Sequence, residues 1–254
     1  MKSVKLFVSL FLLSFLSLPI NANEGKLAFE NANAAYAKKD FDNAILLYGN
    51  ILKSNLESAA LYYNLGNAYY QKNEFAKAIL NYERAKKIAP TDSDILNNLN
   101  LANQKIEDKL EVAPEFFLLQ WKNLLLNLMN EKAWSITCIL LLCFACLLFA
   151  GYFISKNILI KQIAFYSGTV LGALFITTFF IAKHAYFTSK NGTEAIILSS
   201  VAAVNASPSE NGKKLFILHA GSKVSITKQD ENWFEITISN GNVGWIKEDQ
   251  LEKI

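Results

Sequence analysis

Residues 64–90 read NLGNAYYQKNEFAKAILNYERAKKIAP, and this stretch decides the fold of the N-terminal half of the chain. It predicts two helical segments on either side of a turn at 71–74. The small residues Gly66 and Ala78 allow these antiparallel helices to approach closely. Pro90 ends the second helix, because proline lacks the backbone N–H and its ring clashes with the preceding turn. The stretch therefore predicts a tightly packed helical hairpin.

The pattern resembles the tetratricopeptide repeat, a helical hairpin of about 34 residues. The positions that match its motif are Leu65, Gly66, Tyr69, Ala78, Tyr82, Ala85 and Pro90. A weaker copy lies 34 residues earlier, where Phe41, Ala44 and Tyr48 repeat the aromatic and small positions of the second helix. The resemblance implies a repeat domain over 23–113, with repeats at 25–58 and 59–92 and a capping helix at 93–110. A plain bundle of helical hairpins is the alternative.

In the tetratricopeptide family, the first helix of each unit lines a concave groove that binds extended peptides. By the register of the motif, the groove positions here are Phe29, Asn33, Tyr36, Tyr63, Asn67, Tyr70, Asn97, Leu101 and Gln104. Aromatic and amide side chains suit this role, because amides bond to a peptide backbone and rings cover its side chains. The alternative is that these aromatic side chains only fill helix interfaces.

The N-terminal segment 1–22 has the features of a secretory signal peptide. Lys2 and Lys5 precede an apolar run at 6–18, and the small residue Ala22 stands where cleavage is expected. The apolar run is shorter than the ~20 residues that span a bilayer. We therefore expect cleavage, with an uncleaved signal anchor as the alternative.

Two later segments, 133–154 and 163–187, are long and apolar enough to be transmembrane helices. The connection at 155–162 carries Lys156 and Lys161 and no acid, so the positive-inside rule predicts that it is cytoplasmic. The signal and this loop give the same topology. Both soluble parts are therefore expected on the same, outer side of the membrane.

The segment 114–132, just before the first span, is rich in leucine and aromatic residues and poor in charge. Trp121 lies within it, and Trp134 follows it directly. This composition predicts a helix that lies in the membrane interface. A helix that packs under the repeats is the alternative.

The C-terminal segment 195–254 contains short β-rich runs separated by turn signals. It resembles the bacterial SH3-like barrel, whose landmarks match Pro208, Gly221, Val224, Trp233, Ile236, Gly244, Trp245 and Ile246. Trp245 and Ile246 are expected in the core, whereas Trp233 is a candidate for either the core or a binding surface. The resemblance implies a module that binds cell-wall peptides or other proteins, or only packs against a neighbouring domain.

Charge argues against a nucleic-acid partner. The net charge of +3 comes from the signal and the membrane segment. Residues 23–113 carry 11 Lys and Arg against 12 Asp and Glu, and residues 188–254 carry 7 against 8. A nucleic-acid-binding domain needs a basic face, and neither soluble part supplies one.

The cysteines and histidines argue against an enzyme. Cys138, Cys143 and Cys146 all lie in one apolar run, where small buried side chains are a simpler reading than the redox spacing of the last two. His184 lies at a membrane boundary, and His219 is the one histidine of the soluble parts. This set cannot build a Cys-His hydrolase or a His-Cys zinc site. We expect no metal or other cofactor.

The whole domain order is similar to that of the BatE-type proteins of bacterial aerotolerance operons. The expected fold class is a multidomain membrane protein: an all-α tetratricopeptide repeat array, two transmembrane helices and a small all-β SH3-like barrel. The resemblance implies an inner-membrane location, a role in stress tolerance, and partners that carry von Willebrand A domains together with a MoxR-type ATPase.

These observations lead to two hypotheses for function. The first is a non-enzymatic scaffold that presents the repeat groove and the barrel to protein partners in the periplasm. The second is a cell-wall sensor or anchor whose barrel binds peptidoglycan. An enzyme is the third and least supported reading, because no nucleophile and base stand together in the sequence.

Overall fold

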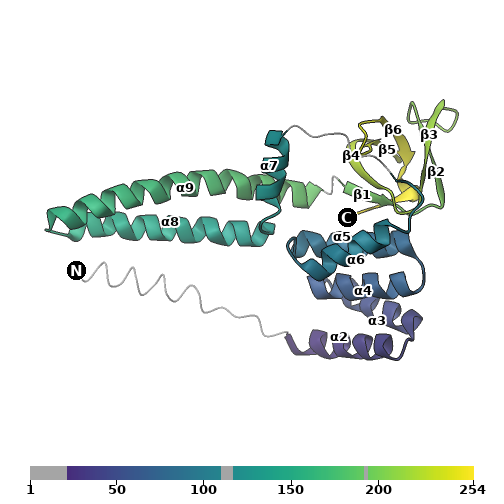
Figure 1. Ribbon diagram of the computed structural model, residues 1–254, viewed down its shortest axis with the longest axis horizontal. Coiled ribbons are helices and arrows are strands. Elements are labelled where there is room, and N and C mark those ends of the chain that lie inside the picture. Colours follow the sequence, from purple (N-terminus) through teal and green to yellow (C-terminus); the bar gives the residue numbers. More distant parts are fainter. Residues whose placement is uncertain (1–21, 110–116, 192–193) are drawn as a thin grey trace. The chain divides into compact units, whose positions relative to one another are not determined.

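The computed structural model describes residues 22–109, 117–191 and 194–254 (Figure 1). The chain divides into two compact units, Met1–Glu57 and Ser58–Ile254. The first unit contains helices α2 (Ala22–Ala37) and α3 (Phe41–Lys53). Apart from Ala22, which opens α2, the expected signal peptide lies outside the described residues.

The second unit begins with helices α4 (Ala59–Gln71), α5 (Phe75–Ile88) and α6 (Ser93–Asn103). It continues with α7 (Phe117–Leu126), α8 (Glu131–Ile154) and α9 (Ile158–Asn191), and ends in a domain of seven β-strands. Within the described residues 22–109, the only regular elements are α-helices, as the sequence predicts.

The hairpins α2–α3 and α4–α5 repeat the same contacts at an interval of 34 residues. Lys39 and Asn73 occupy the same turn position, each with a φ of 61°. Four ring pairs show the same repetition: the centroids of Phe29–Tyr48 and Tyr63–Tyr82 lie 6.0 Å apart, and those of Tyr36–Phe41 and Tyr70–Phe75 lie 5.4 Å apart. The repeat is thus present in the packing as well as in the sequence.

Gly66 is the point of closest approach within the second hairpin. A Cβ atom at Gly66 would lie 2.7 Å from both Cδ1 and Cε1 of Tyr82, which is shorter than van der Waals contact. Tyr82 is 1% exposed, so its ring has little room to move. The close helix contact predicted at Gly66 is therefore confirmed.

Helix α6 is shorter than predicted. It begins where expected, with the carboxylate of Asp92 accepting hydrogen bonds from the backbone N–H groups of Asp94 and Ile95. It ends at Asn103, whereas the sequence predicted a helix over 93–110. Residues 104–107 turn away from the helix axis, which brings Ile106 and Asp108 against the β domain. Tertiary contacts therefore override the helical pattern at this end.

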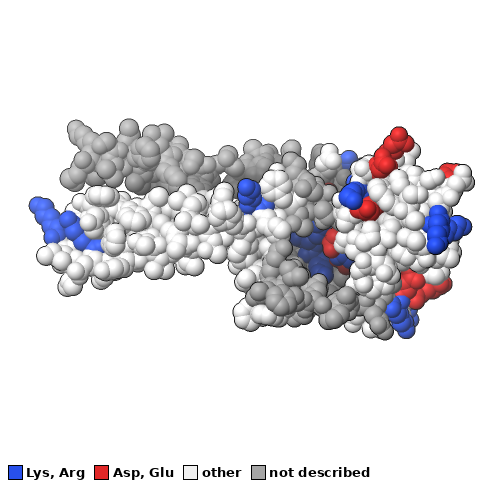
Figure 2. Space-filling view, turned by 90° about the horizontal axis from the view of Figure 1, so that it is seen from above, with Lys and Arg blue, Asp and Glu red and all other residues white. Residues whose placement is uncertain are grey.

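Helices α8 and α9 form a hairpin and run side by side (Figure 1). Both are long and apolar enough to cross a membrane, by length and composition. Figure 2 shows an uncharged surface along the hairpin, with basic side chains at the end where the two helices connect. The length and composition of these helices are compatible with a membrane location.

The bounds of the two apolar helices differ from the predicted ones. The connection shrinks from 155–162 to three residues, because the side chain of Asn157 accepts a hydrogen bond from Leu159 N–H (2.9 Å) and starts α9 at Ile158. Lys161 therefore lies in the first turn of α9. A Cβ atom at Gly168 would lie 3.4 Å from the ring of Phe149, which places Gly168 at the contact between the two helices.

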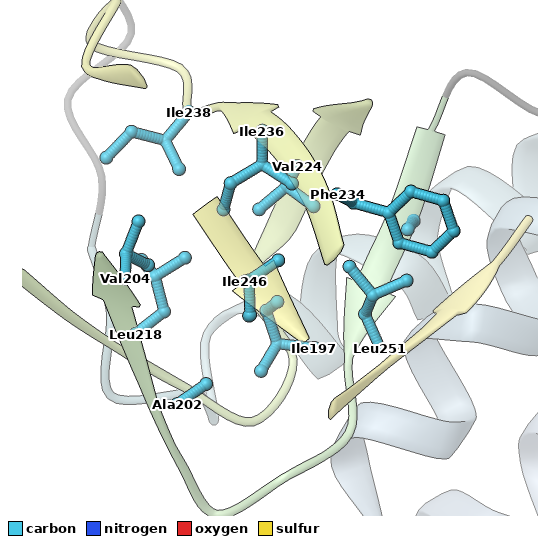
Figure 3. Close-up of a cluster of buried hydrophobic side chains, with 11 residues drawn as sticks. Ile197, Ala202, Val204, Leu218, Val224, Phe234, Ile236, Ile238, Ile246 and Leu251 are labelled. Carbon is cyan, nitrogen blue, oxygen red and sulfur yellow. The ribbon is translucent and has the colours of Figure 1, made fainter. Parts of the chain in front are cut away.

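The β domain is an antiparallel sheet with the strand order β3-β2-β6-β5-β4-β1-β7. The strands are β1 (Glu194–Ile197), β2 (Val201–Asn205), β3 (Lys214–His219), β4 (Lys223–Asp230), β5 (Trp233–Thr237), β6 (Val243–Lys247) and β7 (Leu251–Lys253). Their inward side chains form one core, in which Leu218, Phe234, Ile236 and Ile246 are at most 1% exposed (Figure 3).

The expectation for Ile246 is confirmed, but that for Trp245 is wrong. Side chains alternate between the two faces of a strand. Gly244 and Ile246 are both buried, so Trp245 between them points outward and is half-buried. Only glycine fits at this inward position, because a Cβ atom at Gly244 would collide with Val204 Cγ1.

Candidate functional site

The predicted groove positions of α4 take part in hydrogen bonds between helices. Asn67 Oδ1 accepts a hydrogen bond from the Tyr82 hydroxyl (2.7 Å) and another from Asn98 Nδ2 (2.8 Å). Asn98 Nδ2 also lies within hydrogen-bond distance of the Tyr63 hydroxyl oxygen (3.0 Å). The structure thus brings Tyr63 and Asn67 together, with Asn98 as the link to α6. Asn67 has a structural role in addition to any role in binding.

Asn98 is a residue that the sequence analysis missed. Adding the repeat period to Asn64 leads to Asn98, but the groove register pointed to its neighbour Asn97. In the structure Asn97 is exposed, as are Leu101 and Gln104. These three residues lie on the open side of α6, while Asn98 faces α4.

The first unit contains the same hydrogen bond between a tyrosine and an asparagine. The Tyr48 hydroxyl donates a hydrogen bond to Asn33 Oδ1 (2.7 Å), just as the Tyr82 hydroxyl does to Asn67. Phe29 and Tyr36 are half-buried against the rings of Tyr48 and Phe41. The aromatic side chains therefore do fill helix interfaces, as the alternative interpretation proposed. They remain half-buried, so each also keeps an exposed edge.

The second repeat and the β domain share a hydrophobic cluster, which the sequence analysis did not foresee. Ile196 of β1 is fully buried in the same cluster as Ile79 of α5 and Leu99 of α6. Gly221 completes the contact at a φ of 97°. A Cβ atom there would lie 2.4 Å from Ile106 Cγ2 and 3.3 Å from Ile79 Cδ1, so any side chain at this position would collide with the repeat.

We call this contact between the second repeat and the β domain the junction. Asp108 is its polar centre. Its carboxylate accepts hydrogen bonds from the backbone N–H of His219 (2.7 Å) and from the Ser222 hydroxyl, and it lies 2.7 Å from Nδ1 of His219. Burial tends to raise the pKa of Asp108, but these donors outweigh burial and lower it. The hydrogen bond with Asp108 raises the pKa of His219, and Glu107 lies 3.4 Å from Nε2 of the ring.

Two further ion pairs join α5 to the β domain. Lys223 Nζ lies 3.1 Å from Glu83 and 2.9 Å from Glu194, both measured to a carboxylate oxygen. Burial opposes the charge of Lys223, but the two acids outweigh it and raise its pKa. Arg84 pairs with Glu252 (2.8 Å) and also donates to the backbone oxygen of Lys253 (2.7 Å). The second repeat and the β domain are therefore joined by apolar, hydrogen-bonded and ionic contacts.

Trp233 lies on the outer side of β5 and is half-buried. Lys247 Nζ stands 5.8 Å from the centroid of its ring, and Lys247 also pairs with Glu210. The residues that carry the described junction come from β1, the 219–223 segment and β7. Trp233 belongs to none of these segments, so the candidate barrel surface is separate from the junction.

Within the described ranges, no group of three or more His, Cys, Asp or Glu side chains is placed to hold a metal ion. What the residues of both candidate surfaces offer is aromatic area, amide groups and a few charges. Such surfaces suit non-covalent recognition of peptides or glycans.

Comparison with protein families agrees with both modules. Residues 29–93 match the tetratricopeptide repeat model, and residues 200–252 match the model described as a bacterial SH3 domain. No curated protein matches the chain. Both resemblances to module families are thereby confirmed. Both modules are typically non-catalytic interaction domains, and bacterial SH3 domains often act outside the cytoplasm and can bind peptidoglycan.

Proposed function

We propose that this chain is a non-enzymatic scaffold of the bacterial inner membrane that holds partner proteins on the periplasmic side. The observation that carries the proposal is the junction between the second repeat and the β domain. Ile196 is buried between α5 and α6, and Asp108 binds two residues of the β domain. Joined in this way, the second repeat and the β domain would present their surfaces at a fixed spacing.

The junction also supports the proposed topology. The second repeat and the β domain are in direct contact, so they must lie on the same side of any membrane that α8 and α9 cross. Two spans return the chain to its starting side, which meets this requirement. With the basic residues Lys156 and Lys161 at the turn of the hairpin, the positive-inside rule favours the periplasm for both modules.

For partners, we propose membrane proteins with von Willebrand A domains and an associated MoxR-type ATPase, in a complex that serves stress tolerance. The support is the order of the parts, which resembles that of BatE-type proteins. The groove would offer Phe29, Asn33, Tyr36, Tyr63, Asn67, Tyr70, Asn97, Leu101 and Gln104 to an extended segment of a partner.

A cell-wall sensor or anchor is the second candidate function. Its specific support is the match to the bacterial SH3 domain together with Trp233, whose ring lies beside the cation of Lys247 on the outer side of the sheet. An aromatic ring with a neighbouring cation suits a peptide stem that carries carboxylates.

The test is affinity purification of the full chain from detergent-solubilised membranes. The informative variant replaces Leu101, which is 48% exposed on α6, with alanine. Its matched control is Leu96→Ala on the same helix, where leucine is 38% exposed and is not a predicted groove residue. Proteins that wild type and Leu96→Ala recover and Leu101→Ala loses would support the scaffold.

The same preparation tests the second function by co-sedimentation with purified cell-wall sacculi. Sedimentation that Trp233→Ala abolishes, with no co-purifying protein, would favour the anchor. If neither partner proteins nor sacculi are retained by the wild-type chain, both proposed functions are wrong.

A further inference from the structure

Helix α7 and the residues just after it expose an unusual amount of apolar surface. Trp121 is 67% exposed and Leu124 is 68% exposed. The other exposed apolar side chains of this stretch are Phe117, Leu125, Leu128 and Met129. An exposed apolar area of this kind marks a surface that contacts protein, membrane or ligand.

The exposed side chains form a stripe along the helix. Within α7, Phe117, Trp121 and Leu124 follow one another at spacings of four and three, which places them on one face of the helix. The rings of Phe117 and Trp121 already touch edge to face, with centroids 6.4 Å apart. The stretch 117–129 contains one lysine and no acid, so its partner has to be apolar.

The alternative from the sequence was a helix packed under the repeats. The second repeat and the β domain belong to the same unit as α7, yet they leave Trp121 and Leu124 about two-thirds exposed. The second repeat therefore does not supply the missing cover for this stripe.

Chain connectivity places α7 next to the first apolar helix. Helix α7 ends at Leu126 and α8 begins at Glu131. At about 3.5 Å per residue, these five steps reach at most about 18 Å. Asn130 fixes the start of α8, because its Oδ1 accepts from Ala133 N–H (2.8 Å) and its Nδ2 donates to the Ile88 carbonyl of α5 (2.6 Å).

We propose that α7 lies flat in the membrane interface, with Trp121 at the boundary between headgroups and acyl chains. The inference rests on the proposed membrane location, because only then does the start of α8 mark a bilayer surface. Tryptophan favours this depth, where its ring is in an apolar layer and its N–H reaches water. Because α7 is nearly uncharged, apolar burial and not attraction to anionic lipid holds it there.

Fluorescence quenching by brominated lipids tests the proposal on the full chain reconstituted into phosphatidylcholine vesicles. Trp134→Phe is the parent variant, and Trp121→Phe/Trp134→Phe is its matched control. Trp134 Nε1 is buried without a hydrogen-bond partner in the structure, so its replacement by Phe removes no bond. The two tryptophans of the β domain remain as a constant background.

We expect bromine near the headgroup end of the lipid chain to quench the parent more strongly than bromine near the chain end. The difference should vanish in the double variant and should not change with added salt or anionic lipid. A parent that resists alkaline carbonate extraction but shows no quenching of Trp121, or stronger quenching by deep bromine, would overturn the interfacial helix. Release by carbonate would instead overturn the membrane location on which the proposed function rests.

Discussion

The two repeats have the same interior and different outer surfaces. Tyr48 and Tyr82 bond to equivalent asparagines, and their rings meet equivalent partners at equal distances. The charged residues of α5 that pair with the β domain have no counterpart in α3, because Gly49 and Asn50 occupy the positions equivalent to Glu83 and Arg84. The shared contacts build a hairpin, whereas the residues that differ recruit a second domain.

A further difference lies in the hairpin seam. Ala32 stands in the first repeat where Gly66 stands in the second, and Ala32 is fully buried there. The first hairpin therefore accommodates a methyl group beside its tyrosine. The second hairpin places the ring of Tyr82 only 2.7 Å from where such a group would be.

The largest expected effect is that of Gly66→Leu. Its side chain has to displace the buried ring of Tyr82, and overpacking of this kind typically costs about 1–3 kcal/mol. Gly66→Ala recreates the residue of the first repeat and should cost less. Thermal unfolding of the detergent-solubilised chain, followed by circular dichroism, measures both. Equal melting temperatures for wild type and Gly66→Leu would contradict the packing described at this seam.

The next largest loss of stability is expected for Asp108→Ala, because this change removes the acceptor for His219 and Ser222. Leaving buried donors without a partner costs about 1–3 kcal/mol. Limited proteolysis between the second repeat and the β domain should become faster. Glu107→Gln is the control, since the Glu107 side chain is 77% exposed and should have little effect. Equal cleavage rates for both variants would show that Asp108 does not hold the junction.

Tyr48→Phe and Tyr82→Phe test whether the two interiors are equivalent. Each substitution removes one hydrogen bond to an asparagine, with an expected cost of about 0.5–1.5 kcal/mol. Chemical denaturation of each variant gives the two values. A clearly larger loss in one repeat would mean that equal distances do not imply equal energies in the two hairpins.

Arg84→Asn places the residue of the first repeat on α5. It breaks the ion pair with Glu252, whose side chain is 49% exposed. The expected loss in the free energy of unfolding is therefore only about 0.2–1 kcal/mol. The loss should shrink at high salt. A loss that is independent of salt would show that the hydrogen bond to the Lys253 carbonyl or the stem of Arg84, and not the ion pair, makes the contact.

The smallest expected effect is a pH dependence at His219. Its pKa is raised above the ordinary 6.5 in the folded chain, chiefly by the hydrogen bond with Asp108. The resulting stabilisation is present below pH 6.5 and is lost as the pH rises through the raised value. Melting temperatures over this interval should fall more for wild type than for Asp108→Ala. Parallel curves for the two proteins would show that the bond between His219 and Asp108 does not make stability depend on pH.

The repeats and the sheet were predictable because both rest on local periodicity. The tetratricopeptide match begins at Phe29, and the bacterial SH3 match contains the predicted landmarks from Pro208 to Ile246. Trp245 was misplaced although the alternation of side chains along β6 would have assigned it to the outer face. The family motif suggested a core position for Trp245, whereas the alternation of side chains gives the position that the structure shows.

The junction could not be predicted from the sequence. Asp108 and His219 are 111 residues apart, and nothing near either residue indicates the other. The same contacts explain why α6 ends before its predicted limit, because Ile106 and Asp108, which lie within the predicted helix, contact the β domain instead. The groove residues remain a proposal, although Asn67 now has a structural partner in Tyr82 that the sequence did not reveal.

The separation of Asp108 from His219 also sets an order of events during synthesis. At about 5–20 residues per second, roughly 6–22 seconds pass between the two residues. Until β1 is made, late in this interval, α5 and α6 lack the strand whose Ile196 buries their shared apolar face. If α8 and α9 are membrane spans, the chain must also cross the bilayer twice before that strand arrives. The second repeat therefore depends for its completion on a strand made after both apolar helices, and a chaperone that shields Ile79 and Leu99 meanwhile would protect it from aggregation.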